Sequence, residues 1–100
     1  MSNVNMQQIY MQDRNIVSRM IAGEVILVPI HNNVADMDYI FTLNETAARV
    51  WELTDGQHSL AEIHQHLLAE FEVDDAEAAQ DLITLTQDLL EINAIFEAQA

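Results

Sequence analysis

The side chains best suited to metal or acid–base chemistry in this chain are three histidines, His58, His64 and His66. Imidazole is a common ligand of zinc, but two ligands on one helix need a spacing of three or four residues. His64 and His66 are two residues apart on a predicted helix, and because each residue turns by about 100° they point to nearly opposite sides. His58 lies before that helix. The spacing therefore favours surface or half-buried histidines, and no metal site is expected.

Other reactive groups are missing or have a simpler explanation. The chain contains no cysteine, so it cannot supply a thiolate zinc site, an iron–sulfur ligand set or a cysteine nucleophile. The adjacent acids Asp74 and Asp75 stand at a predicted helix start, where negative charge offsets the positive end of the helix dipole. The sequence shows neither a glycine-rich phosphate loop nor a nucleophile with a spaced base. We therefore expect no catalytic residues and no cofactor.

Charge narrows the range of partners. The chain has 17 Asp and Glu residues, no lysine and only Arg14, Arg19 and Arg49 as cations, for a formal net charge of -14. Such a chain repels the phosphates of nucleic acids and anionic lipids, so neither a nucleic acid nor a membrane is an expected partner. Cationic or neutral partners are favoured, although acidity can also serve solubility alone. With no apolar run long enough to span a bilayer and no secretory signal, a cytoplasmic protein is expected.

The length and composition predict a single domain, because 100 residues with half of them apolar can form one core but not two. Residues 1–13 are polar and methionine-rich without a sustained period. That pattern predicts a mobile N-terminal arm or a strand that docks late. The folded domain is expected to cover residues 14–97.

Three strands are predicted in the first half of the chain. Ile16–Ile21 and Glu24–Val28 flank Ala22-Gly23 in the way that two strands flank a hairpin turn. Pro29 lacks an amide donor and is expected to close the second strand. Tyr39–Leu43 alternates large and small side chains, which favours a third strand with one face toward a core.

Three helices are predicted after the strands, each opened by a side chain that can accept hydrogen bonds from the first free amides. Asp55-Gly56 separates the first two helices and gives the region a helix-turn-helix character. The predicted caps are Asn44, Ser59 with Glu62, and Asp74, and the helices cover about residues 45–54, 60–71 and 75–93.

The third helix is more apolar than burial of one face requires, because Ile83 and Leu90 form a second row beside its main stripe. The N-terminal arm, a homodimer contact or a partner peptide could cover that row, and the sequence leaves these three open. Trp51 is in line with the apolar positions of the first helix and is predicted to be a core residue.

Several of these segments together carry a family resemblance, and the stretch from Leu43 to Gly56 is its most specific part. The sequence resembles the PqqD-like family, whose prototype is the small chaperone of pyrroloquinoline quinone biosynthesis and whose relatives are recognition elements for ribosomally made, modified peptides. The resemblance covers about residues 14–96. It rests on Gly23-Glu24-Val25-Ile26-Leu27, Leu43-Asn44-Glu45-Thr46-Ala47-Ala48-Arg49-Val50-Trp51-Glu52-Leu53, Asp55-Gly56, Ser59, Glu62-Ile63 and Val73-Asp74.

The resemblance implies an α+β, winged-helix-like domain with a three-stranded antiparallel sheet followed by a three-helix bundle, and no catalytic residues. It implies that the leader segment of a precursor peptide adds to the third strand beside the third helix, and that a modifying enzyme, often a radical S-adenosylmethionine protein, receives it. A strand added to an open sheet edge is also a general mode of peptide capture. The positions that match the peptide site are Tyr39, Ile40, Phe41, Thr42, Leu43, Asp81, Leu82, Thr84, Leu85, Asp88 and Leu89.

Two alternatives belong to other functional classes. The helix-turn-helix character favours a winged-helix transcription regulator, whose last helix would enter the major groove of DNA. The acidic third helix, which has no lysine or arginine, argues against it. A self-associating structural or interaction module is the second alternative.

Overall fold

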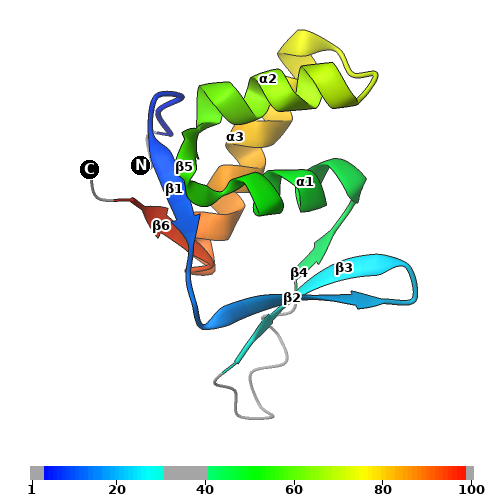
Figure 1. The fold of residues 1–100 in the computed structure, drawn as a ribbon, viewed down its shortest axis with the longest axis vertical. Coiled ribbons are helices and arrows are strands. Elements are labelled where there is room, and N and C mark those ends of the chain that lie inside the picture. Colours follow the sequence, from blue (N-terminus) through cyan, green and yellow to red (C-terminus); the bar gives the residue numbers. More distant parts are fainter. Residues whose placement is uncertain (1–3, 31–40, 99–100) are drawn as a thin grey trace.

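A computed structural model describes residues 4–30 and 41–98 of the chain. These residues form three helices and two three-stranded sheets, and every strand pairing in both sheets is antiparallel (Figure 1). The predicted α+β class is therefore confirmed, with a second sheet that the sequence did not predict. No helix in the described part combines the length and the apolar character needed to cross a bilayer.

The first sheet contains the predicted hairpin. Strands β2 (Ile16–Ile21) and β3 (Glu24–Pro29) pair along their whole length, and the third strand β4 (Phe41–Leu43) pairs with β3. Ala22 and Gly23 connect the hairpin with positive φ angles of 52° and 84°, the combination required by a two-residue turn that follows the strand twist. Pro29 closes β3, as predicted. The hairpin lies below α1 in Figure 1.

The three helices begin at the predicted caps. Helix α1 (Glu45–Leu53) follows Asn44, whose side chain accepts the Ala47 amide. Helix α2 (Leu60–Glu70) has the full capping box between Ser59 and Glu62, and α3 (Asp75–Glu91) follows Asp74. Each cap satisfies an amide that has no partner within its helix, so the polar residues at these positions determine where the helices start.

The second sheet has β1 (Ile9–Gln12) at its centre, with β5 (Asp55–Ser59) on one side and β6 (Ile95–Glu97) on the other. β1 lies within the segment for which the sequence predicts a mobile arm or a late-docking strand. Tyr10, on this strand, is only 2% exposed. Residues 4–12 are therefore docked in this structure, while the placement of the first three residues lies outside the described part.

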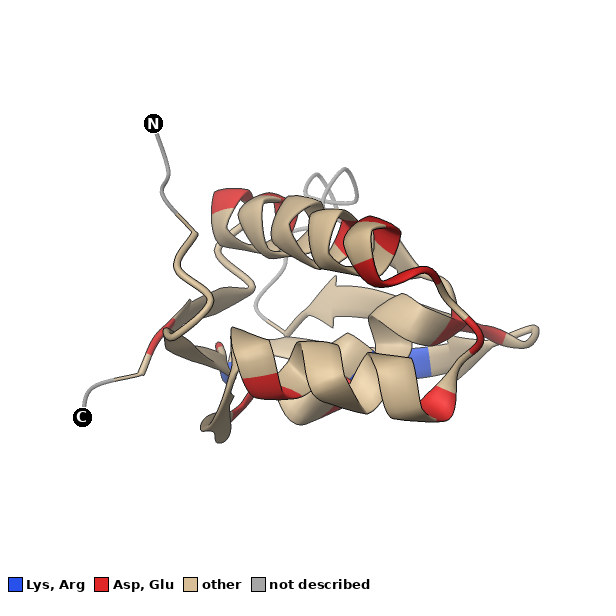
Figure 2. Cartoon of the chain, turned by 90° about the horizontal axis from the view of Figure 1, so that it is seen from above, with Lys and Arg blue, Asp and Glu red and all other residues tan. Residues whose placement is uncertain are grey.

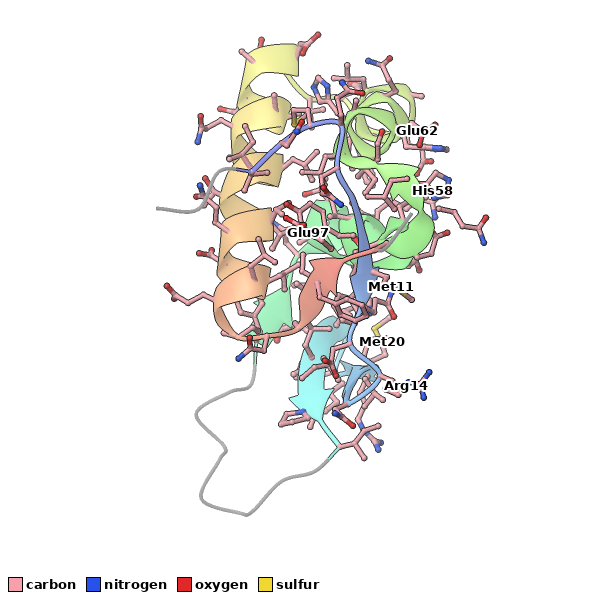
Figure 3. The ribbon with its side chains drawn as sticks, turned by 90° about the vertical axis from the view of Figure 1, so that its left-hand side faces the viewer. Met11, Arg14, Met20, His58, Glu62 and Glu97 are labelled. Carbon is pink, nitrogen blue, oxygen red and sulfur yellow. The ribbon has the colours of Figure 1, made fainter. Side chains whose placement is uncertain are left out.

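Backbone hydrogen bonds hold the chain just before β1 against the start of α2. The Met6 carbonyl accepts the Ala61 amide at 2.8 Å, and the Gln8 carbonyl accepts the Leu60 amide at 3.1 Å. These are first-turn amides, which have no acceptor within their own helix. Val4 and Met6 also pack against the core. Leu90 of α3 is another half-buried residue that packs against it. Figure 3 shows this N-terminal segment crossing α3 before it runs down as β1.

The core lies between the helices and both sheets. Trp51 is 3% exposed, so its predicted core role is confirmed. The buried hydroxyls of Thr54, which follows α1, and Thr86, within α3, each donate to the carbonyl four residues earlier, which offsets the cost of burying them. The other large core side chains come from all three helices and from β1, β3, β4 and β6, and they include Tyr10, Leu27, Leu43, Leu60, Ile63, Leu67, Leu82, Leu89 and Ile95.

Candidate functional site

Strand β4 forms an edge of the first sheet, and the register shows which of its residues faces outward. The residues flanking a two-residue hairpin turn form a hydrogen-bonded pair, and the backbone groups of successive residues then alternate between the two sides of a strand. The even-numbered residues of β3 therefore turn toward β2, in agreement with the bond from the Ile30 amide to the Asn15 carbonyl at 2.7 Å. Val25 and Leu27 turn toward β4 and face Leu43 and Phe41.

The residue between these two pairs is Thr42, which lies opposite Ile26. The backbone groups of Phe41 and Leu43 face β3, where they can form hydrogen bonds with that strand. The amide and carbonyl of Thr42 therefore point to the other side of β4. No other described strand pairs with that side, and the Thr42 side chain is exposed. An extended chain laid beside β4 could therefore form both hydrogen bonds with Thr42.

A cleft of about 370 Å³ lies beside this edge, between β4 and α3. Apolar side chains make its floor, and they come from all three helices, from β4 and from the residues between α2 and α3. Half-buried and buried groups are both present, so a ligand would contact the core directly. The apolar residues that line the cleft are Phe41, Ala47, Val50, Leu67, Val73, Ala78, Leu82 and Leu85.

The wall of the cleft that α3 forms is acidic. Glu77, Asp81 and Asp88 line it and are all exposed, and Figure 2 shows acidic positions along the length of this helix. Within the described residues, none of the three forms an ion pair. The opposite wall, made by Thr42 and Asn44, is uncharged. The two sides of the cleft thus offer different chemistry: free backbone groups on one and free carboxylates on the other.

Seven of the eleven residues predicted for a peptide site line this cleft, and two more are buried beside it. Leu43 and Leu89 are 3% and 1% exposed, and they do not line the cleft. Leu43 instead borders a second hollow between the hairpin, β4 and the outer face of α1. Tyr39 and Ile40 lie outside the described residues. The seven that line the cleft are Phe41, Thr42, Asp81, Leu82, Thr84, Leu85 and Asp88.

Sequence reasoning missed the residues that reach the cleft from α1 and α2. The apolar periodicity places Ala47 and Val50 in the buried stripe of α1, and Leu67 in that of α2. All three do pack in the core, and they also form the floor of the cleft. Periodicity identifies an apolar face but cannot show which part of it stays open. Glu77 was missed because it lies in the first turn of α3, three residues after the Asp74 cap, where an acid is expected for helix stability alone.

The only cation on the helices is already engaged. Arg49 donates to both carboxylate oxygens of Glu70, at 2.8 and 3.0 Å, and to Glu52 at 3.1 Å. The hydrogen bond from Arg49 is the main cause that holds the pKa of Glu70 below its usual value, and desolvation opposes it. Arg49 therefore ties α1 to α2 and leaves the acids of the cleft uncompensated.

The rings of His58 and His66 meet edge to face with their centroids 5.5 Å apart, but His64 does not join them. His58 contacts Asp55 at 3.0 Å, His64 contacts Asp75 at 3.1 Å, and His66 contacts Glu70 at 3.3 Å, each with a different carboxylate. Burial favours a higher pKa for Asp55, but hydrogen bonds from the His58 ring and from the Gln57 amide outweigh it and lower that pKa. Figure 3 shows His58 on the side of α2 and β5. Residues 4–30 and 41–98 contain no group of three His, Asp or Glu side chains arranged to hold a metal ion.

Comparisons with known proteins find solved structures with a similar fold. A solved structure described as TbiB1 in complex with the TbiA(beta) leader peptide superposes with a TM-score of 0.67 and 24% identity, over 85% of this chain and 93% of the other. A second, a lasso peptide synthetase B1 complexed with the leader peptide, has a TM-score of 0.67 and 27% identity, over 87% and 96%. No curated protein matches the chain. The family model for coenzyme PQQ synthesis protein D matches residues 24–95, and the chain therefore belongs to the PqqD family.

Proposed function

We propose that this chain is a non-catalytic protein that captures the leader of a ribosomally made precursor peptide and presents it to a modifying enzyme. The observation that carries the proposal is the outer edge of β4, which no other described strand covers, beside a cleft with an apolar floor. Backbone hydrogen bonds at such an edge give affinity for any extended peptide, and the side-chain contacts in the cleft give selectivity. The two solved structures that share the fold are both described with a leader peptide bound, which supports the same role here.

The proposed contact surface has two parts. Thr42 supplies the amide and carbonyl for strand addition, and the predicted contacts of Tyr39 and Ile40 would extend that edge toward the preceding chain. Leu82 and Leu85 of α3, with Phe41 of β4, supply the apolar contacts for alternate peptide side chains. Leu43 and Leu89 act beneath this surface as supports, because both are buried.

The identity of the receiving enzyme forms a finer part of the proposal. Membership of the PqqD family supports a radical S-adenosylmethionine enzyme, which would bring its own iron–sulfur clusters. This chain would then contribute binding and orientation only. Co-purification of that enzyme with this chain, in the presence and absence of the precursor peptide, tests this part. The same strand edge could instead pair with a second copy of this chain in a homodimer. Sedimentation at several protein concentrations shows whether the chain self-associates.

The main experiment is calorimetry with the leader peptide encoded beside this gene. Thr42→Pro removes the outward amide of β4 without removing a β3 bond, whereas Thr42→Ala keeps the amide and shortens only the side chain. We expect Thr42→Pro to weaken binding by about tenfold or more, because it costs one hydrogen bond and constrains the added strand. Thr42→Ala should stay within about threefold of the wild type. The proposal fails if the wild-type chain does not bind at tens of micromolar, or if both variants bind equally.

A further inference from the structure

We propose that the cleft selects peptides by charge, and that it favours a leader whose side chains near α3 are lysine or arginine and disfavours one with acids there. This inference rests on the proposed function, since it concerns the occupant of the same cleft. Its starting point is the contrast between the two walls. The β4 wall is neutral, while Glu77, Asp81 and Asp88 of α3 have no cationic partner among the described residues.

The three acids form one line along the helix. From Glu77 to Asp81 is four residues and from Asp81 to Asp88 is seven, which returns the side chain to within about 40° of the same direction in each case. At about 1.5 Å per residue, the row extends for about 16 Å along the helix axis. An extended peptide rises about 3.3 Å per residue, so about five residues cover the same length. A peptide segment of about five residues could therefore lie against the whole row.

A peptide added to β4 would alternate its side chains between the apolar floor and the solvent side of the cleft. Apolar residues fit the floor positions. Lysine and arginine at the outward positions can lay their alkyl stems along the peptide and place the charged end near the α3 wall. Aspartate or glutamate at the same positions would meet three carboxylates of like sign, with no nearby arginine to compensate, because Arg49 is held by Glu70 and Glu52.

The expected size of the preference is modest and depends on salt. Exposed ion pairs contribute little singly, but two or three acting together should change affinity by about tenfold, which corresponds to about 1.4 kcal/mol. Because the acids are solvent-exposed, added salt screens them over about 10 Å at 0.1 M and should reduce the preference. Association rates should respond as well, since a net charge of -14 attracts a basic peptide before contact.

A peptide-display selection tests the inference and leaves the sequence of the bound peptide free to vary. A library of random linear peptides is panned against three proteins: the wild type, Asp81→Asn/Asp88→Asn, and the control Glu24→Gln/Glu97→Gln. Both variants lose two negative charges, all four residues are exposed, and the control residues do not line the cleft. We expect peptides enriched in lysine and arginine from the wild type and the control, and loss of that enrichment with the cleft variant.

The outcomes separate this inference from the proposed function. If peptides are recovered but show no excess of lysine and arginine, or if the control loses the excess as fully as the cleft variant, selection by the cleft charge is wrong and peptide binding stands. If no peptide is recovered by any of the three proteins, the proposed function fails and the inference fails with it. Peptides that still bind Thr42→Pro with unchanged affinity occupy another surface and also contradict the inference.

Affinity measurements make the test quantitative. One selected basic peptide is compared with a version in which glutamine replaces each lysine and arginine, by calorimetry at low salt and at physiological salt. We expect the basic peptide to bind about tenfold more tightly at low salt, with a smaller ratio at higher salt. The ratio should approach one in Asp81→Asn/Asp88→Asn. An equal ratio in that variant and in the wild type would overturn the inference.

Discussion

The two sheets of this protein have the same number of strands and opposite roles. The sheet of β5, β1 and β6 joins three distant parts of the chain and places Tyr10 and Ile95 in the core. The sheet of β2, β3 and β4 also contributes two buried apolar residues, Leu27 and Leu43, but its hairpin projects Met20 into solvent at 70% exposure. The sheet of β5, β1 and β6 thus completes the core, whereas the sheet of β2, β3 and β4 leaves the outer side of β4 unpaired by any described strand, beside a cleft. Stability and binding should therefore respond to different substitutions.

The largest effect should come from the sheet that completes the core. Tyr10→Ala removes a side chain that is 2% exposed, and we expect it to lower the free energy of unfolding by about 3–5 kcal/mol, as other truncations of large core aromatics do. Met20→Ala, on the exposed hairpin, should change it by about 0.5 kcal/mol or less. Urea denaturation followed by circular dichroism measures both. Comparable losses in the two variants would remove the distinction between the sheets.

Hydrogen exchange should show the same contrast at single amides. We expect the amide of Thr42 to exchange rapidly in the free chain, because it points to the open edge, and the amides of β1 to exchange slowly. A bound leader peptide should slow exchange at Thr42 by about tenfold or more, as a hydrogen bond and lost solvent access require. NMR-detected exchange with and without the peptide resolves these sites. A protected Thr42 amide in the free chain would contradict the open edge.

Alkaline pH should weaken the core sheet through Tyr10. Burial, with a smaller contribution from Glu97, raises the pKa of the Tyr10 phenol. A raised folded-state pKa means that the folded chain favours the neutral phenol, so this contribution is complete below the unfolded pKa of about 10 and is lost as pH rises above it. Tyr10→Phe should therefore lose less stability than the wild type between pH 9 and about 11. Parallel pH profiles of the unfolding free energy would test this.

The smallest effect should come from the ion pair that joins α1 to α2, away from both sheets. The Arg49 hydrogen bond lowers the pKa of Glu70, so the stabilisation is present above the usual pKa of a glutamate and is lost as pH falls through the lowered value. Glu70→Gln should be slightly less stable than the wild type at pH 7 and equal to it at a pH below about 3. Glu24→Gln, a change at an exposed acid on the hairpin, is the control. A difference that persists in acid would point to lost packing.

The elements that local chemistry specifies were predictable. The hairpin turn at Ala22-Gly23, the stop at Pro29 and the three helix caps each depend on residues adjacent in sequence, and the structure confirms them. β5 and β6 were not predicted, because Asp55–Ser59 is polar and turn-like in composition and Ile95–Glu97 is too short to show a period. Both become strands through pairing with β1, a distant partner that no local pattern reveals.

The candidate site was predictable in the same uneven way. The resemblance pointed to β4 and α3, but the outward direction of Thr42 follows only from the register with β3. The apolar periodicity of α1 and α2 predicted that Ala47, Val50 and Leu67 are core residues, but it could not show that they also line an open cleft. A residue that both packs in the core and lines the cleft shows the same apolar periodicity as one that only packs, so the sequence assigns it to the core alone.

The pairing of β1 with β6 has a consequence for how the molecule can be joined to others. The Ala98 amide donates to the Ile9 carbonyl at 2.9 Å, so the strands nearest the two ends of the chain lie one strand spacing apart, about 5 Å. The chain before β1 is itself held on the start of α2 through the carbonyls of Met6 and Gln8, so a protein fused on the N-terminal side would sit beside α2, whereas one fused after Ala98 would sit beside β1. Fusions on the two sides of this domain would therefore place the joined protein over different parts of its surface.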